Sequence, residues 1–231
     1  MKPARTVGFT LVELLVVVAI MAIMLGLAIP AFQGSGRGAK ARSAVFQLNT
    51  TLNLARQMAI TTRQNVHILF PGQLFNGGIT TYTTNTIGLA YSAYAVYGVR
   101  DGYIGEWRRL PAGVVFDADI VPPGDTIANQ PFNVFRQLTS TLPGATNFLK
   151  TVPYFVRPGD GARQMLALTY RPDGAIDHAG FNRRGVYITE GWVTHNPAFG
   201  DVQVNYRPEA TVFGLEIRPE TGQTRAREYL P

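Results

Sequence analysis

The architecture of this chain is set near its amino terminus, by Gly8-Phe9-Thr10-Leu11-Val12-Glu13-Leu14-Leu15-Val16-Val17 and the apolar run that continues to Phe32. Between residues 9 and 29, the only side chains that are not apolar are Thr10, Glu13 and the bare Gly26. A helix of about 21 residues is roughly 30 Å long, which matches the hydrocarbon thickness of a bilayer. The segment is therefore predicted to form a helix that can span a membrane.

Glu13 is the residue in this run that needs an explanation. A carboxylate inside a membrane helix costs about 2.5–3.5 kcal/mol, so it is expected to have a partner or a function. A cleavable secretory signal has an apolar core of about 7–15 residues, a small-residue cleavage site and no carboxylate. A plain single-span anchor explains the length and the basic Lys2 and Arg5 on the cytoplasmic side, but it leaves Glu13 and the Gly8-Phe9 junction unexplained.

The same residues resemble the processing motif of type IV prepilins and type II secretion pseudopilins. In that family, the membrane enzyme prepilin peptidase cuts after the glycine that matches Gly8 and methylates the new amino terminus, here Phe9. The glutamate that matches Glu13 is held to neutralise the amino terminus of a neighbouring subunit during assembly. A helix-breaking proline stands at the place of Pro30. The resemblance implies processing between Gly8 and Phe9, assembly through Glu13 and a helix hinge at Pro30.

Helical periodicity returns after a glycine-rich interruption. Pro30 and the run Gly34-Ser35-Gly36-Arg37-Gly38 are unfavourable in a helix, which is expected to kink or melt there. From Ala39 to Ile60, apolar residues recur at three- and four-residue steps. This second helical segment is predicted to be amphipathic, with one face available to pack on a sheet.

The remainder of the chain reads as strands separated by turn signals that contain proline, glycine and asparagine. No further long helix is indicated, although Phe132–Leu138 is compatible with a short one. The strands are expected at Val66–Phe70, Leu89–Val99, Val114–Phe116, Val152–Val156, Leu166–Tyr170, Gly185–Val193, Val202–Tyr206 and Thr211–Ile217.

Three segments resemble the GspH/FimT branch of minor pseudopilins and pilins. They are the helix-to-strand passage 48–70, the late strand and turn Leu168–Gly174, and the final hairpin Phe213–Arg225. The region Tyr82–Phe116 has no counterpart in that branch. The implied fold is α+β and type IV pilin-like, with a long N-terminal helix, transmembrane in its first half, packed on a β-rich, mainly antiparallel domain.

This fold divides the chain into four expected parts. Residues 1–8 are a cleaved leader, 9–32 the transmembrane and filament-core helix, and 33–62 the hinge and the amphipathic second half of the helix. Residues 63–231 form the globular domain, with an inserted surface loop at about 119–147.

No constellation of catalytic or metal-binding residues is recognisable. The chain has no cysteine, its three histidines lack metal-ligand spacing, and no serine lies in a Gly-x-Ser-x-Gly pattern. Asp117, Asp119 and Asp125 have oxygen ligands to offer Ca²⁺, but solvated loop carboxylates are the favoured interpretation. The protein is therefore predicted to be structural, with no enzymatic activity, metal or cofactor.

A segment rich in tyrosine invites a contact function. If residues 91–97 form one strand, Tyr91 and Tyr97 share a face and Tyr94 points to the other. Exposed tyrosines would suit a protein contact or base stacking, and the sequence does not choose between them.

The resemblance implies a minor pseudopilin or minor pilin of a type II secretion pseudopilus or a type IV pilus, acting in initiation or at the tip. Its partners would be prepilin peptidase, other pilins of the filament and the inner-membrane assembly platform. It would be a single-pass protein of a bacterial inner membrane, with the globular domain outside the cytoplasm.

The alternative is a DNA-binding minor pilin for uptake of transforming DNA. The formal net charge of +6 permits this, but the only adjacent basic pairs are Arg108-Arg109 and Arg183-Arg184.

Overall fold

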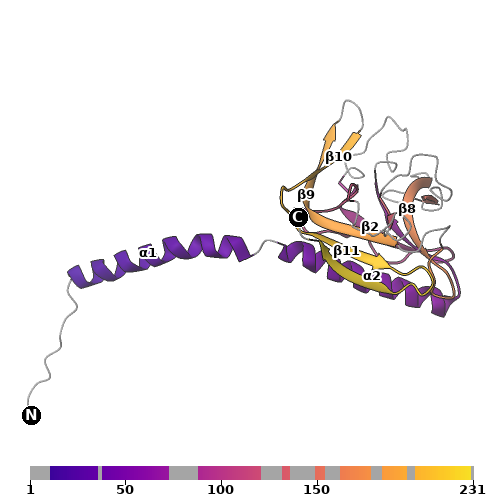
Figure 1. Cartoon of the computed structure of the whole chain (residues 1–231), viewed down its shortest axis with the longest axis horizontal. Coiled ribbons are helices and arrows are strands. Elements are labelled where there is room, and N and C mark those ends of the chain that lie inside the picture. Colours follow the sequence, from indigo (N-terminus) through magenta and orange to yellow (C-terminus); the bar gives the residue numbers. More distant parts are fainter. Residues whose placement is uncertain are drawn as a thin grey trace, which may run out of the picture. The chain divides into compact units, whose positions relative to one another are not determined.

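The computed structural model of the chain describes residues 11–35, 38–72, 88–120, 132–135, 149–153, 162–177, 184–196 and 201–229. It separates into two compact units, Met1–Ala39 and Lys40–Pro231. Two helices precede the strands along the chain (Figure 1). The elements are α1 (Leu11–Ser35), α2 (Ala39–Thr62), β1 (Val66–Phe70), β2 (Ala93–Gly98), β3 (Gly102–Tyr103), β4 (Arg108–Arg109), β5 (Val114–Phe116), β6 (Phe132–Asn133), β7 (Leu149–Pro153), β8 (Ala162–Tyr170), β9 (Arg184–Asn196), β10 (Asp201–Tyr206), β11 (Val212–Ile217) and β12 (Thr224–Tyr229).

Helix α1 is not interrupted at its proline. Pro30 lies inside α1, which continues to Ser35, and the next helix starts at Ala39 after Gly38 with a φ of 75°. The two helices are thus separate elements, and α1 extends into the glycine-rich run as far as Ser35. A left-handed φ costs a glycine such as Gly38 little. A hinge at Pro30 itself stays a prediction.

The second helix is amphipathic, as its sequence predicts. Its buried residues recur every three or four positions, and Leu48 and Leu52 are completely inaccessible to solvent. Phe46 and Leu54 lie off this stripe and are exposed. The buried stripe consists of Ala41, Ala44, Val45, Leu48, Thr51, Leu52, Ala55 and Ala59.

The first sheet has the strand order β3-β2-β1-β8-β7, with β4 also paired to β2, and its pairs are antiparallel. The central strand β1 places Ile68 opposite Val96 of β2 and Leu168 of β8. All five residues of β1 are buried, because both faces of this sheet are covered.

The second sheet is built around β9. Ile188 of β9 pairs with Phe213 of β11 and with Phe116 of β5, so these two strands lie on opposite edges of β9. The C-terminal half of β9 pairs with β10, and the outer edge of β11 pairs with β12. The short β6 is parallel to β9, whereas the other pairs of this sheet are antiparallel.

The main core joins α2 to residues of both sheets, including Ile68, Leu168, Ile188 and Leu215. A second, smaller cluster of Leu69, Leu89, Ala93, Met165 and Ala167 lies on the other face of the first sheet. Tyr97, Tyr103 and Trp107 pack against this smaller cluster. An α+β architecture with mainly antiparallel sheets is therefore confirmed.

The tyrosine segment differs from its predicted arrangement. Strands at Val66–Phe70 and Val114–Phe116 are confirmed, but the second predicted strand begins only at Ala93. Residues 88–92 form turns, and Tyr91 has a φ of 53°. Tyr91 is consequently in the main core with Tyr94, while Tyr97 belongs to the smaller cluster. The prediction that Tyr91 and Tyr97 share a face is wrong, because the turn interrupts the alternation.

The short helix with which Phe132–Leu138 was compatible does not form in the described residues 132–135. Residues 132–133 form β6, and Val134 and Phe135 are buried in the main core. Phe135 packs on the rings of Phe70 and Phe116. Asn133 stabilises this backbone, because its Oδ1 accepts from the Phe135 N–H at 3.1 Å. Residues 121–131 and 136–147 of the predicted loop lie outside the described residues.

Candidate functional site

The N-terminal segment contains the residues that the sequence singles out. Gly8 and Phe9 lie outside the described residues, and Glu13 is in the first turn of α1. A carboxylate is favourable there, because the amino end of a helix carries partial positive charge. Every residue from Leu11 to Met24 is exposed, with Leu11 80% and Leu14 59% accessible. An apolar surface of this kind marks contact with a membrane or another protein.

Within the part of the chain that the structure describes, no helix meets the length and hydropathy that a membrane crossing requires.

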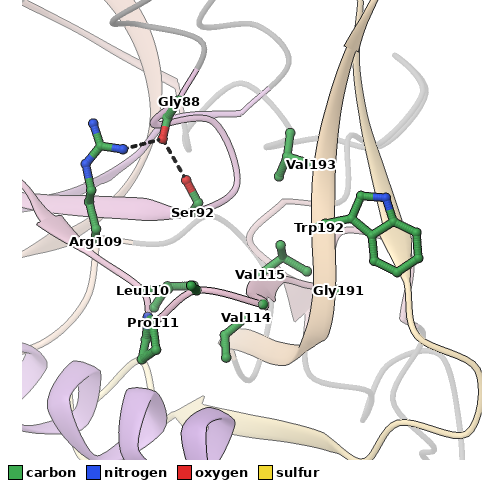
Figure 2. A pocket seen from close by; sticks show the side chains of 12 residues that line it. Gly88, Ser92, Arg109, Leu110, Pro111, Val114, Val115, Gly191, Trp192 and Val193 are labelled. Carbon is green, nitrogen blue, oxygen red and sulfur yellow. Dashed lines mark hydrogen bonds between the residues drawn. The ribbon is translucent and has the colours of Figure 1, made fainter.

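A groove on the globular unit is the second candidate site (Figure 2). Its volume is about 440 Å³, within the range of ligand-binding pockets. Three segments form it: the turn before β2, which contains Gly88 and Ser92, the stretch from β4 to β5, and β9. The lining residues are Gly88, Ser92, Arg109, Leu110, Pro111, Ala112, Gly113, Val114, Val115, Gly191, Trp192 and Val193.

Arg109 supplies the charge of the groove. Its Nη1 donates to the carbonyl oxygen of Gly88 at 3.0 Å, and the Ser92 hydroxyl donates to the same oxygen at 3.0 Å. Arg109 is exposed, and the lining residues include no carboxylate. The groove therefore combines an aliphatic lining with one guanidinium, a combination suited to an apolar ligand that carries a negative charge.

The side chain of Trp192 points away from the groove (Figure 2), although Trp192 is one of the lining residues. Figure 2 shows its indole on the opposite side of β9 from the Val193 side chain, as alternation along a strand requires. The indole is 54% accessible. Sequence analysis missed this site, because its walls meet only through tertiary contacts. No local sequence motif indicates that residues 109–115 meet Gly191 and Val193.

The two adjacent basic pairs do not form one charged surface in the described residues. Arg108 is exposed but donates to the Thr51 hydroxyl at 2.8 Å, and Arg109 lines the groove. Arg184 is inaccessible to solvent, and burial lowers the pKa of its guanidinium to about 10. Arg183 lies outside the described residues. These positions give no specific support to DNA binding.

His67 and Asp117 are buried and form hydrogen bonds with nearby residues. His67 is buried, its Nδ1 lies 2.8 Å from the Thr169 hydroxyl, and its ring stacks on Tyr97. Asp117 accepts hydrogen bonds from the N–H groups of Asp119 and Ile120, at 3.0 and 2.9 Å. Burial raises the pKa of the Asp117 carboxyl despite these bonds. Among the described residues, no group of histidines and carboxylates is arranged to hold a metal ion.

The family model of the prokaryotic N-terminal methylation motif matches residues 8–29. This match supports the type IV pilin and pseudopilin family, and a pilin-like protein that prepilin peptidase cleaves and methylates. It also implies assembly with other pilins and a structural role, and it is consistent with a membrane-anchored pilin. No curated protein and no solved structure matches the chain.

Proposed function

We propose that this chain is a minor pseudopilin or minor pilin, held in a bacterial inner membrane by one helix and incorporated at the start or tip of a filament. The observation that carries the proposal is the methylation motif at residues 8–29, which contains Gly8, Phe9 and Glu13. The α+β globular unit with antiparallel sheets is consistent with this assignment.

Each residue of the motif has a proposed role. Prepilin peptidase reads Gly8, and Phe9 becomes the methylated amino terminus. Glu13 pairs with the amino terminus of a neighbouring subunit. In apolar surroundings an unpaired ammonium or carboxylate is costly, whereas the pair is tolerated, so the pairing favours one register between subunits.

Membrane insertion and assembly use the same apolar surface. Before assembly, the run from Phe9 to Ile29 is covered by lipid; in the filament, it is covered by the corresponding helices of other subunits. The exposure of residues 11–24 supports this proposal, because α1 buries none of these side chains within its own unit. Pro30 and the glycines after it allow the helix to adjust between the two environments.

The first experiment measures the intact mass of the protein from its host's membranes and from sheared filaments. We expect a chain that begins at Phe9 with one added methyl group, at low stoichiometry in the filament fraction. Deletion of the protein is expected to reduce the number of filaments. An uncut chain would overturn the processing step, and absence from filaments would overturn the minor-subunit role.

A further inference from the structure

One edge of β9 is open where it borders the groove. β5 pairs with β9 only as far as Val114 opposite Glu190, and the chain then turns away through Gly113, whose φ is 84°. The last bond on this edge runs from the Gly191 N–H to the Gly113 oxygen, at 3.0 Å. On the other edge, β10 pairs with β9 from Gly191 to Asn196.

The direction of the main-chain groups follows from these contacts. The Gly191 N–H points to the β5 side, whereas the Glu190 oxygen accepts from the Arg207 N–H on the β10 side. Because successive residues of a strand direct their main-chain groups to alternate edges, the N–H and C=O of Val193 point to the open edge. In the described part of the chain, neither Val193 group has a hydrogen-bond partner.

Among the described residues, this edge lacks the usual protection against pairing. Native proteins block open edges with lysine, proline, bulges or a covering segment. Trp192, Val193 and Thr194 are instead residues that favour strands, and none of them carries a charge. The open stretch from Trp192 to Asn196 is about five residues, or roughly 16 Å, long enough for one short added strand.

We infer that the open edge of β9 and the adjoining groove bind an extended segment of another protein chain by strand addition, the segment having alternating aliphatic side chains and one carboxylate. Main-chain groups of the guest would pair with Val193, in line with β5. Its aliphatic side chains would lie against Leu110, Pro111 and Val115 in the groove. The carboxylate is required by charge complementarity, because Arg109 is the charged residue of the lining. Strand addition of this kind derives affinity from main-chain bonds and specificity from side-chain pockets.

The test uses the full-length chain in detergent micelles and three fluorescein-labelled seven-residue peptides. Valine alternates with threonine in each peptide, and a glutamate replaces the first, central or last threonine. Fluorescence anisotropy measures the dissociation constant. We expect saturable binding of at least one peptide, weakened several-fold by Arg109→Gln and by replacing the peptide's glutamate with glutamine.

Val193→Pro is the decisive variant, with Val193→Ala as its matched control. Proline removes the N–H on the open edge and leaves the β10 ladder intact, because Val193 does not direct its main-chain groups to β10. We expect Val193→Pro to weaken binding at least tenfold and Val193→Ala to weaken it much less. A peptide N-methylated at alternate positions is expected to fail on the unaltered chain, which tests the inference even if Val193→Pro does not fold.

Two results would overturn the inference: no saturable binding up to about 1 mM, the weak end of specific recognition, or binding that is insensitive to both Val193→Pro and N-methylation. The inference goes beyond filament assembly through α1. Correct processing without peptide binding would contradict the strand-addition site alone, and peptide binding by an uncut chain would contradict the filament role alone.

Discussion

At the scale of single residues, two glycines allow two turns to contact each other beside Arg56 of α2. Gly174 and Gly222 have φ values of 79° and 65°, which favour glycine over other residues. A Cβ atom on Gly222 would lie 2.1 Å from the Gly174 oxygen and 2.9 Å from Tyr170 Cε1. Arg56 of α2 joins the two turns, since its Nε donates to the Thr221 oxygen at 2.7 Å and reaches the Gly174 oxygen at 3.3 Å.

Gly222→Ala is therefore expected to destabilise the globular unit by roughly 2–5 kcal/mol, from the strained φ and the overlap combined. Gly105→Ala is the matched control. Its φ is 81°, but an added Cβ would meet nothing within 4 Å, so about 1–2 kcal/mol is expected. Urea titrations followed by fluorescence give both values. Equal losses would show that the contact between the turns contributes little.

Asp117 should make stability depend on pH. Burial raises the pKa of its carboxyl, so between the unfolded and the folded pKa the folded state binds more protons than the unfolded state. Stability should consequently fall as pH rises above the ordinary carboxyl pKa of about 4. Asp117→Asn retains an acceptor oxygen for the Asp119 and Ile120 N–H groups and should flatten this fall.

Asp173 provides a control of opposite sign for the pH experiment. The Arg171 guanidinium lowers the pKa of the Asp173 carboxyl, so its contribution is present above the ordinary pKa and is lost as pH falls. Thermal unfolding of both asparagine variants and the unaltered chain, between about pH 4 and pH 7, checks the two signs. A steeper fall in Asp117→Asn than in the unaltered chain would contradict the assignment.

At the scale of elements, α2 connects the two sheets through its buried stripe. Leu48 is inaccessible, so Leu48→Ala should cost about 2–5 kcal/mol for lost burial and the cavity that remains. Leu54, six residues further along the helix, is 44% accessible, and Leu54→Ala should change stability by no more than about 0.5 kcal/mol. Urea denaturation of the two variants compares the same substitution on opposite faces. Similar losses would mean that the stripe is not the principal contact of α2.

At the scale of the whole molecule, Glu13 tests the proposed assembly. Glu13→Ala is expected to be cleaved, methylated and inserted, yet absent from sheared filaments, because the amino terminus of its neighbour would lack a partner. Glu13→Gln should fail in the same way, since it keeps the size and loses the charge. Thr10→Ala, which changes the other polar side chain of the run, should assemble normally.

Intact mass and quantification of the filament fraction read out each step separately. Normal assembly of Glu13→Ala would contradict charge pairing. A bulky replacement of Gly8 is expected to block cleavage itself.

The sequence was most informative where local pattern alone decides structure. Strands at Val66–Phe70 and Val114–Phe116 were predicted with their observed bounds, because short β-rich runs between turn residues have few alternatives. The final hairpin at 213–225 was expected from the family resemblance, and β11 and β12 form it with Gly222 between them. At Tyr91, the local pattern failed to predict the turn. Tyr91 has a positive φ, and a residue other than glycine adopts such a φ only where the surrounding structure stabilises it.

What the sequence determined by itself is the N-terminal segment, where the methylation motif, the apolar run and Glu13 depend on no distant contact. The amphipathic α2 and most strands also belong to this part, because side-chain periodicity encodes which face is buried. Tertiary structure alone decided that Phe135 joins the core and that β5 ends beside β9, leaving Val193 at an open edge. Such features arise from pairings between residues many positions apart, whose register depends on the whole packed core and is carried by no local stretch of sequence.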